Sequence, residues 1–254
     1  MAMQKFMKHE FALYVMGLST LTKSVSQGDI ITITEEKIVH RIMAVLRLSP
    51  HEECIFFDQY IHIQCIIKEF IGKKQVLCTI QQKKINTILS PSLTFLLPLL
   101  KRDDFENALY SLTELGATTI QLVVTQKTHD SSFNQKDMER AQRIIIAAAE
   151  QSKNFSYPTI KTPISLLKII DTLTTPIKIF FDPQGKSFAS ITQHLLIESP
   201  NDIVLLVGPE GDLSNEEKEM ITLKNFIACA LTPTILRSVQ AAVLGTGLVR
   251  SLLR

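Results

Sequence analysis

The chain has 254 residues, of which 45% are hydrophobic. This length and composition are typical of a globular protein with one large domain or two modest ones, and they exclude a chain too polar to build a core. The formal net charge is only +2, so bulk charge does not indicate nucleic-acid binding. A basic RNA-binding face would have to come from the arrangement of residues.

The cysteines and histidines show no metal-binding or disulfide pattern. The cysteines lie in apolar stretches without C-x-x-C spacing, and the histidines form no H-x-x-x-H pair. We therefore expect reduced core cysteines in a cytoplasmic protein, in preference to disulfides, and no metal site. These cysteines are Cys54, Cys65, Cys78 and Cys229.

The two longest apolar runs of the sequence are not typical of an export signal or a membrane span. The run from Phe11 to Leu18 is short and lacks a cleavage pattern. The run from Ile88 to Leu100 contains Pro91 and Pro98 and is too short to cross a bilayer. We expect a soluble protein without membrane partners.

The first third of the chain has a β-strand pattern. Short runs rich in Ile, Val, Phe and Thr are separated by turn-like breaks, which predicts a small β-barrel over residues 1–86. One helix is expected among them, from Glu35 to Leu46, because its apolar residues recur at helical spacing. The expected strands cover residues 30–34, 53–58, 61–70 and 75–81.

The join to a second domain, 87–254, is expected in the polar and Pro-bounded stretch from Lys83 to Pro91. Strand and helix patterns alternate from Ser92 onward, which predicts an α/β fold with a parallel sheet. Strands are expected at 93–100, 119–125, 177–181, 203–207 and 226–231. Helices are expected at 103–115, 136–151, 187–197, after Ser214, and from about Pro233 to the end.

Two stretches each combine a buried strand with an abrupt stop. Ile203 to Val207 has no polar alternation, which favours a strand buried on both faces, and Gly208-Pro209 ends it. We expect Gly211 to take a backbone conformation closed to other residues, and Ser214 to cap the next helix with Glu217. Open α/β sheets bind ligands at such strand ends.

The second stretch repeats this plan near the C-terminus. A strand from Phe226 to Leu231 stops before Pro233, and Arg237 lies near the start of the last helix, where the helix dipole disfavours a cation. Close backbone approach is expected along that helix, either against the chain's own sheet, in a dimer interface, or in both. Its small residues are Ala241, Ala242, Gly245 and Gly247.

Together these residues resemble the SPOUT class of methyltransferases, and most closely its 16S rRNA uracil-N3 methyltransferase family. The resemblance covers almost the whole chain, because five motifs occur in the family's order. They are Val45-Leu46-Arg47, Glu114-Leu115-Gly116, Ala149-Glu150-Gln151-Ser152 followed by Pro158, Gly208-Pro209-Glu210-Gly211 with Leu213-Ser214, and Ile235-Leu236-Arg237.

The resemblance implies a PUA-like RNA-binding β-barrel over 1–86 and a SPOUT domain over 87–254, with a C-terminal trefoil knot and a homodimer. It implies S-adenosylmethionine as cofactor and 16S rRNA of the small ribosomal subunit as substrate. The cofactor would lie in a cleft between three strand-end loops, where backbone amides read it. The implied cofactor residues are Phe181, Asp182, Leu206, Val207, Gly208, Gly211, Leu231, Pro233, Ile235 and Leu236.

Arg237 and Glu210 are the catalytic residues that the resemblance implies. Uracil N3 would attack the methyl group in line after losing its proton, and Arg237 would stabilise the uracil anion. A purely structural role for Arg237, in a salt bridge to Glu210 or to a second subunit, stays open. No general base stands out. The implied RNA-binding residues are Arg41, Arg47, Lys127 and Lys153, although Arg47 fits a solvated helix-end cation equally well.

Several positions depart from the family pattern. Asp212 replaces a glycine, Arg41 a histidine, Gln126-Lys127 the usual Glu-Arg, and Ser238-Val239-Gln240 the usual Thr-Glu-Thr or Thr-Glu-Ala; Thr232 and Thr234 replace Gly and Arg. Most departures fall in the RNA-binding and catalytic groups, whereas the cofactor loops are better kept. The alternative to an active methyltransferase is therefore a weak or inactive RNA-binding or ribosome-assembly protein on the same fold.

Overall fold

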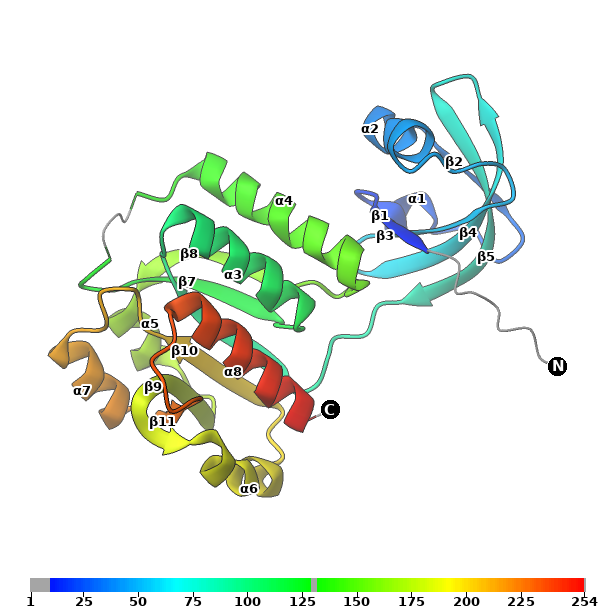
Figure 1. Cartoon of the computed structure of the whole chain (residues 1–254). Coiled ribbons are helices and arrows are strands. Elements are labelled where there is room, and N and C mark those ends of the chain that lie inside the picture. Colours follow the sequence, from blue (N-terminus) through cyan, green and yellow to red (C-terminus); the bar gives the residue numbers. More distant parts are fainter. Residues whose placement is uncertain (1–9, 129–131, 254) are drawn as a thin grey trace. The chain divides into compact units, whose positions relative to one another are not determined.

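The computed structural model describes residues 10–128 and 132–253 of the chain. Within them the backbone forms two compact units (Figure 1). The first runs to Thr87 and also includes Glu150–Ser156, and the second consists of Ile88–Ala149 and Tyr157–Arg254. The division between the units falls between Thr87 and Ile88, and the segment Glu150–Ser156, at the end of a long helix, groups with the first unit.

The first unit contains a five-stranded sheet in the order β1-β3-β4-β5-β2, in which only the β1 and β3 pair is parallel. A barrel was expected here, but among the described residues no ladder joins the edge strands β1 and β2, so a barrel is not shown. The strands are β1 (Phe11–Tyr14), β2 (Ile30–Ile33), β3 (Glu53–Phe57), β4 (Ile61–Ile71) and β5 (Gln75–Ile85).

Alternation of side chains along these strands builds the core of the first unit. In β4, Ile61, Ile63, Cys65 and Ile67 are buried, and the residues between them are partly exposed. Three of the cysteines, on β3, β4 and β5, lie in this core, and all four cysteines of the chain are free and buried. Burial raises the pKa of the Cys229 thiol to about 11, which keeps it protonated and unreactive near neutral pH.

The helix expected from Glu35 to Leu46 is divided into two short segments. An α-helix, α2 (Glu36–His40), continues as a π-helix, η1 (Arg41–Val45), in which the Leu46 amide bonds to the Arg41 carbonyl at 2.8 Å. Arg47 then takes a left-handed backbone, with φ of 53°. Hydrophobic spacing could not show this widened turn. A short helix, α1 (Leu18–Leu21), follows β1.

The second unit is built on a six-stranded sheet in the order β11-β9-β10-β6-β7-β8. Every neighbouring pair is parallel, which confirms the predicted α/β fold with a parallel sheet. The strands are β6 (Ser92–Pro98), β7 (Thr119–Val124), β8 (Thr159–Ser165), β9 (Ile177–Ser187), β10 (Asp202–Val207) and β11 (Ile227–Ala230).

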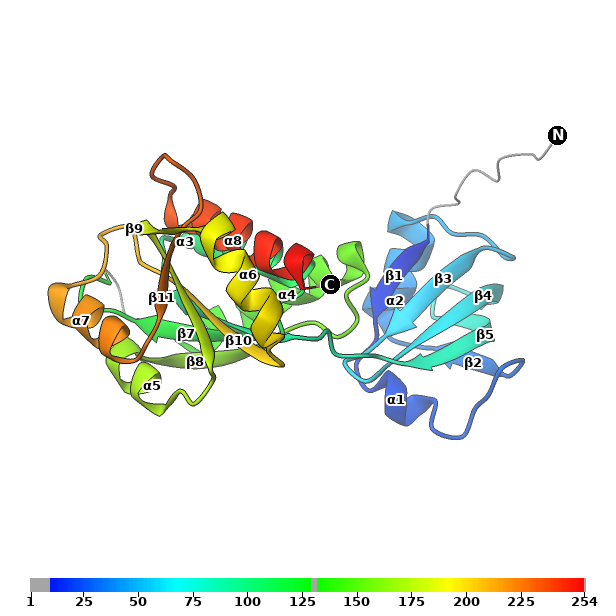
Figure 2. The same ribbon diagram turned by 90° about the horizontal axis from the view of Figure 1, so that it is seen from below.

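Helices cover both faces of this sheet, with α5 and α7 on the side opposite to α3, α4, α6 and α8 (Figure 2). A hydrophobic core lies on each face of the sheet, and strand β10 contributes to both. Ile203, Leu205 and Val207 pack in one core, whereas Val204 and Leu206 pack in the other. The predicted burial on both faces is confirmed. The helices are α3 (Arg102–Glu114), α4 (Gln135–Ser152), α5 (Leu166–Thr172), α6 (Phe188–Glu198), α7 (Asn215–Leu223) and α8 (Ser238–Leu252).

The small residues of α8 permit close packing within the chain. A Cβ on Gly245 would lie 2.3 Å from the ring of Phe181, and one on Gly247 would lie 3.6 Å from the Leu115 side chain. Arg250, in the last turn of α8, donates to the carbonyls of Pro91 at 2.8 Å and Gly116 at 2.6 Å. Packing on the chain's own sheet therefore accounts for Gly245, whereas Gly247 has room for a side chain. No described helix is long and apolar enough to cross a membrane.

Asp58 makes the stability of the first unit sensitive to acid. Its buried carboxylate accepts from the amides of Ser19, Tyr60 and Ile61 at 2.7, 2.8 and 3.0 Å. Burial alone would raise the pKa of Asp58, but these hydrogen bonds outweigh it and lower the pKa.

A carboxylate whose pKa is lowered by folding stabilises the folded state at pH values above the ordinary pKa of aspartate. This stabilisation is lost as the pH falls through the pKa of the folded state. We expect the free energy of unfolding to drop more steeply below about pH 4 in the wild type than in Asp58→Asn. Urea titrations at several pH values measure this difference. Parallel pH profiles for the two proteins would contradict it.

Candidate cofactor pocket

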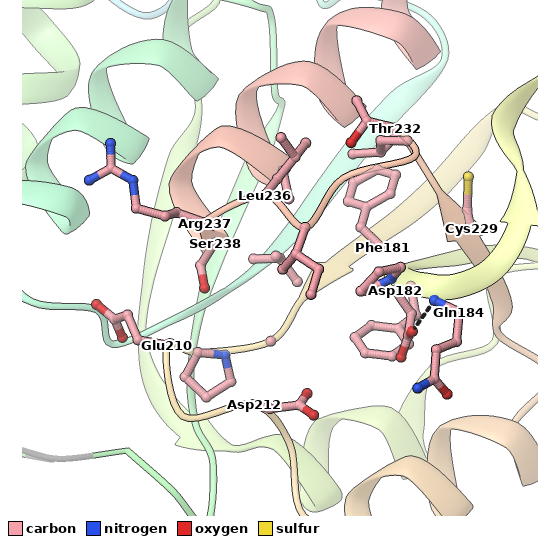
Figure 3. Close-up of a pocket in the computed structure, with 18 of the residues that line it drawn as sticks. Phe181, Asp182, Gln184, Glu210, Asp212, Cys229, Thr232, Leu236, Arg237 and Ser238 are labelled. Carbon is pink, nitrogen blue, oxygen red and sulfur yellow. Dashed lines mark hydrogen bonds between the residues drawn. The ribbon is translucent and has the colours of Figure 1, made fainter.

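The second unit contains a cavity of about 620 Å³ between the irregular middle part of β9 and the loops that follow β10 and β11 (Figure 3). Its lining is mainly apolar but includes three carboxylates and two cationic side chains. The lining residues are Phe180, Phe181, Asp182, Pro183, Gln184, Val207, Gly208, Pro209, Glu210, Asp212, Lys218, Cys229, Leu231, Thr232, Thr234, Ile235, Leu236, Arg237, Ser238 and Ala241.

The loop after β10 forms one wall of this pocket. The predicted capping box is confirmed: the Ser214 hydroxyl accepts from the Glu217 amide at 3.2 Å, and the Glu217 carboxylate accepts from the Ser214 amide at 2.9 Å. The expectation for Gly211 is wrong, because the left-handed residue of the loop is Asp212, with φ of 59°. Aspartate tolerates this conformation better than most residues.

The loop after β11 forms the facing wall. The Thr232 hydroxyl donates to the Thr234 carbonyl at 2.7 Å, which folds the loop back on itself. No hydrogen bond among the described residues uses the backbone amides of Thr232, Ile235 or Leu236. Backbone amides are strong donors that are nearly always satisfied when water is removed. These loop amides are therefore available to a ligand.

The third wall comes from β9, which was expected to end at Phe181 but continues to Ser187. Its pairing with β11 shifts register around Asp182–Gly185, and this irregular stretch faces the pocket. A Cβ on Gly185 would lie 2.3 to 2.5 Å from the backbone of Ala228 and Cys229. Asp182 closes the turn by accepting from the Gln184 amide at 2.7 Å.

The segment after β7 forms hydrogen bonds with the β10 loop and with the helix that follows it. The Gln126 amide donates to the Glu217 carboxylate at 2.9 Å, and Lys127 Nζ donates to the Leu213 carbonyl at 3.1 Å. Lys127, expected to bind RNA, thus holds a loop of the pocket. Glu217 is almost fully buried and receives donors from two segments, so it fixes the geometry of this wall.

The two expected catalytic residues line the pocket but do not pair with each other. Glu210 accepts from the Lys101 amide at 3.0 Å, at the start of α3. Arg237 is the N-cap residue of α8, 73% of its side chain is exposed, and its closest carboxylate partner is Asp104 at 4.0 Å. Figure 3 shows the Arg237 side chain extending away from the centre of the pocket. The predicted position near the helix start is confirmed.

Two of the three expected RNA-binding residues of the first unit, Arg41 and Lys153, have partners within that unit. Arg41 makes a two-bond ion pair with Glu150 at 2.8 Å for each bond, and Glu150 also accepts from the Tyr14 amide. The hydrogen bonds to Glu150 raise the pKa of Arg41. Lys153 Nζ lies 2.6 Å from a carboxylate oxygen of Glu10.

Most of the expected cofactor residues converge on the pocket, but Leu206, Gly211 and Pro233 are not among its lining residues. Leu206 points to the other face of the sheet, because side chains alternate along β10. Lys218 and Cys229 also line the pocket, although no motif in the sequence points to either as a site residue. Among the described residues, no group of three or more His, Cys, Asp or Glu residues is placed to hold a metal ion.

Comparison with known proteins defines the class. Residues 88–250 match the family described as RNA methyltransferase domain, and the chain belongs to this family. Over nearly its full length it is similar to proteins named ribosomal RNA small subunit methyltransferase E. It is 25% identical to that of Rickettsia conorii over 91% of this chain and 94% of the relative, and 26% identical to that of Bacillus subtilis over 87% and 90%.

Solved structures share the fold. A ribosomal RNA small subunit methyltransferase E from Neisseria gonorrhoeae bound to S-adenosyl methionine superposes with a TM-score of 0.80 and 23% identity, over 96% of this chain and 98% of that one. A putative methyltransferase from Legionella pneumophila in complex with the same cofactor gives a TM-score of 0.79 and 21% identity, over the same shares of the two chains.

Proposed function

We propose that this chain is a cytoplasmic S-adenosylmethionine-dependent methyltransferase that modifies N3 of a uridine in 16S rRNA of the small ribosomal subunit. The observation that carries the proposal is the pocket between β9 and the loops after β10 and β11, where no hydrogen bond among the described residues uses the backbone amides of Thr232, Ile235 and Leu236. Family membership and the relatives' names support the reaction class and the rRNA substrate. The uridine N3 position comes from the sequence resemblance.

The residues present fit S-adenosylmethionine. Its adenine and ribose need hydrogen-bond donors and acceptors between apolar walls, and these walls contain Leu231, Ile235 and Leu236 beside the unpaired amides. Its net positive charge suits a lining with one more carboxylate than cation. When bound, the cofactor supplies a methyl group activated by the sulfonium.

The chain's own contribution to the reaction is to position groups and to stabilise charge. Attack by uracil N3 requires loss of the imide proton, so negative charge develops on the uracil ring. The Arg237 guanidinium lies at the pocket rim, and its one ion pair among the described residues is the 4.0 Å contact to Asp104, which leaves it able to turn toward that charge. Glu210 anchors the β10 loop to the start of α3 and so keeps the reacting groups in line.

The resemblance supports three further parts of the proposal. The first unit would bind RNA as a PUA-like domain, the C-terminal segment would form a trefoil knot, and two chains would form a homodimer. Arg47 is the RNA contact we assign first, since Arg41, Lys127 and Lys153 have partners within the chain.

Those internal partners also favour the second candidate, an RNA-binding or assembly protein with weak or no activity. The test that separates the two is methyl transfer from labelled S-adenosylmethionine to small ribosomal subunits that lack the modification. We expect label in 16S rRNA and 3-methyluridine among the digested nucleosides. Subunits that already carry the modification are the control. Binding of the subunit without any transfer would favour the second candidate.

A further inference from the structure

We propose that Asp182, Asp212 and Lys218 form a charged subsite that selects ligands carrying both an amino and a carboxyl group, namely the methionine end of S-adenosylmethionine. This inference rests on the proposed function. It assigns Lys218 to the carboxylate of the ligand, Asp182 to its ammonium, and Asp212 to the positioning of Lys218.

The pocket has two chemically different regions. The loop from Leu231 to Leu236 offers apolar side chains and neutral backbone amides. Asp182 and Asp212 form the second region: in Figure 3 Asp182 lies with Gln184 at the right and Asp212 near the bottom, and both lie below Thr232 and Leu236. A neutral base fits the first region, and a group with full charges fits the second.

Lys218 is fixed in this charged region by Asp212. Its Nζ lies 2.6 Å from Asp212 Oδ2, and Asp212 Oδ1 accepts from the Leu213 amide at 2.7 Å. The hydrogen bond to Asp212, and to a smaller extent the charge of Asp182, raise the pKa of Lys218. An ammonium has three donors, and the described hydrogen bonds of Lys218 Nζ use one of them. The others can bind a carboxylate.

Asp182 offers the complementary charge. Its Oδ1 accepts from the Gln184 amide at 2.7 Å, which fixes the orientation of the carboxylate. No described residue donates a hydrogen bond to its Oδ2 or forms an ion pair with it, so this oxygen can accept from an ammonium. Binding one ligand that carries both charges satisfies Lys218 and Asp182 together.

Asp212 is a difference between this chain and the family pattern. The family pattern has glycine at its position, which agrees with the left-handed φ of 59° found there. A glycine would permit the same turn but would leave Lys218 without its 2.6 Å partner. The aspartate therefore adds a charge that the turn does not need.

The test compares S-adenosylhomocysteine with 5′-methylthioadenosine, which shares the adenosine and the sulfur but lacks the amino-acid end. Isothermal titration with the full chain gives dissociation constants for wild type, Lys218→Met and Asp182→Asn. We expect each variant to weaken S-adenosylhomocysteine binding about ten-fold or more, since hydrogen bonds to charged groups contribute this much. Binding of 5′-methylthioadenosine should change less than about two-fold.

Lys224→Met is the matched control. Lys224 also lies 2.6 Å from an aspartate, Asp171, and the exposed fractions of that pair, 35% and 68%, are close to the 37% and 59% of Lys218 and Asp212. It does not line the pocket, so neither ligand should bind differently. If Lys218→Met weakens both ligands equally, or neither, the subsite is wrong and the function stands. If wild type binds neither compound nor S-adenosylmethionine, the proposed function fails and the subsite with it.

Discussion

Replacing Arg237 with alanine is expected to lower kcat for methyl transfer about 100- to 1000-fold, the usual effect of removing a donor that stabilises charge in the transition state. The dissociation constant for S-adenosylmethionine should stay within about two-fold, because the guanidinium acts on the uracil and not on the cofactor. No hydrogen bond within the described part of the chain uses this highly exposed side chain, so the fold loses none on substitution. Single-turnover kinetics and calorimetry measure the two quantities separately.

Arg102→Ala is the control for this substitution. Arg102 is similarly exposed and also contacts one carboxylate, that of Glu106, but it lies outside the pocket. Its variant should transfer methyl groups at nearly the wild-type rate. An Arg237→Ala variant as active as wild type would remove Arg237 from the mechanism.

Replacing Gly185 with alanine is expected to destabilise the second unit by about 1–3 kcal/mol and to impair the pocket. The added Cβ would meet the Ala228 carbon and oxygen and the Cys229 nitrogen at 2.3 to 2.5 Å. These are backbone atoms of the neighbouring strand, so no side-chain rotation relieves the contact. Strands β9 and β11 must then separate where they form the pocket, and S-adenosylmethionine binding should weaken as well.

Chemical denaturation and calorimetry check both effects. Gly247→Ala is the matched control, because its Cβ would lie 3.6 Å from Leu115, an ordinary contact, and alanine favours a helix more than glycine does. It should be neutral or stabilising. A Gly185→Ala protein with unchanged stability and affinity would show that the close approach of β9 and β11 is not required.

The sequence predicted the long, strongly patterned elements well and the short polar ones poorly. Strand β10 has an unbroken apolar run and α4 is long, so both were found close to their true bounds. Strand β8 was missed, because it lies at the sheet edge with none of its residues fully buried, and it contains Pro163. The β-barrel expected in the first unit is not shown, for a different reason: strand patterns predict strands but not whether the outer two pair.

The pocket could be predicted from the sequence as far as its loops, but its charged partners could not. Parallel strands bring their carboxyl ends to one edge, so the loops after β10 and β11 had to meet. Which side chains reach the cavity depends on single turns: the left-handed Asp212 precedes α7 and pairs with Lys218. The contact between Arg237 and Asp104 likewise joins residues that are far apart in the sequence, so no local sequence pattern could predict it.

A crystal structure of the full chain soaked with S-adenosylhomocysteine tests the central claim most directly. We predict the adenosine between the Gly208–Gly211 and Leu231–Leu236 loops, with hydrogen bonds from backbone amides of the second loop and the amino-acid end beside Lys218. Ligand density elsewhere, or an empty pocket in a crystal with saturating ligand, would contradict the assignment of this pocket as the methyl-donor site.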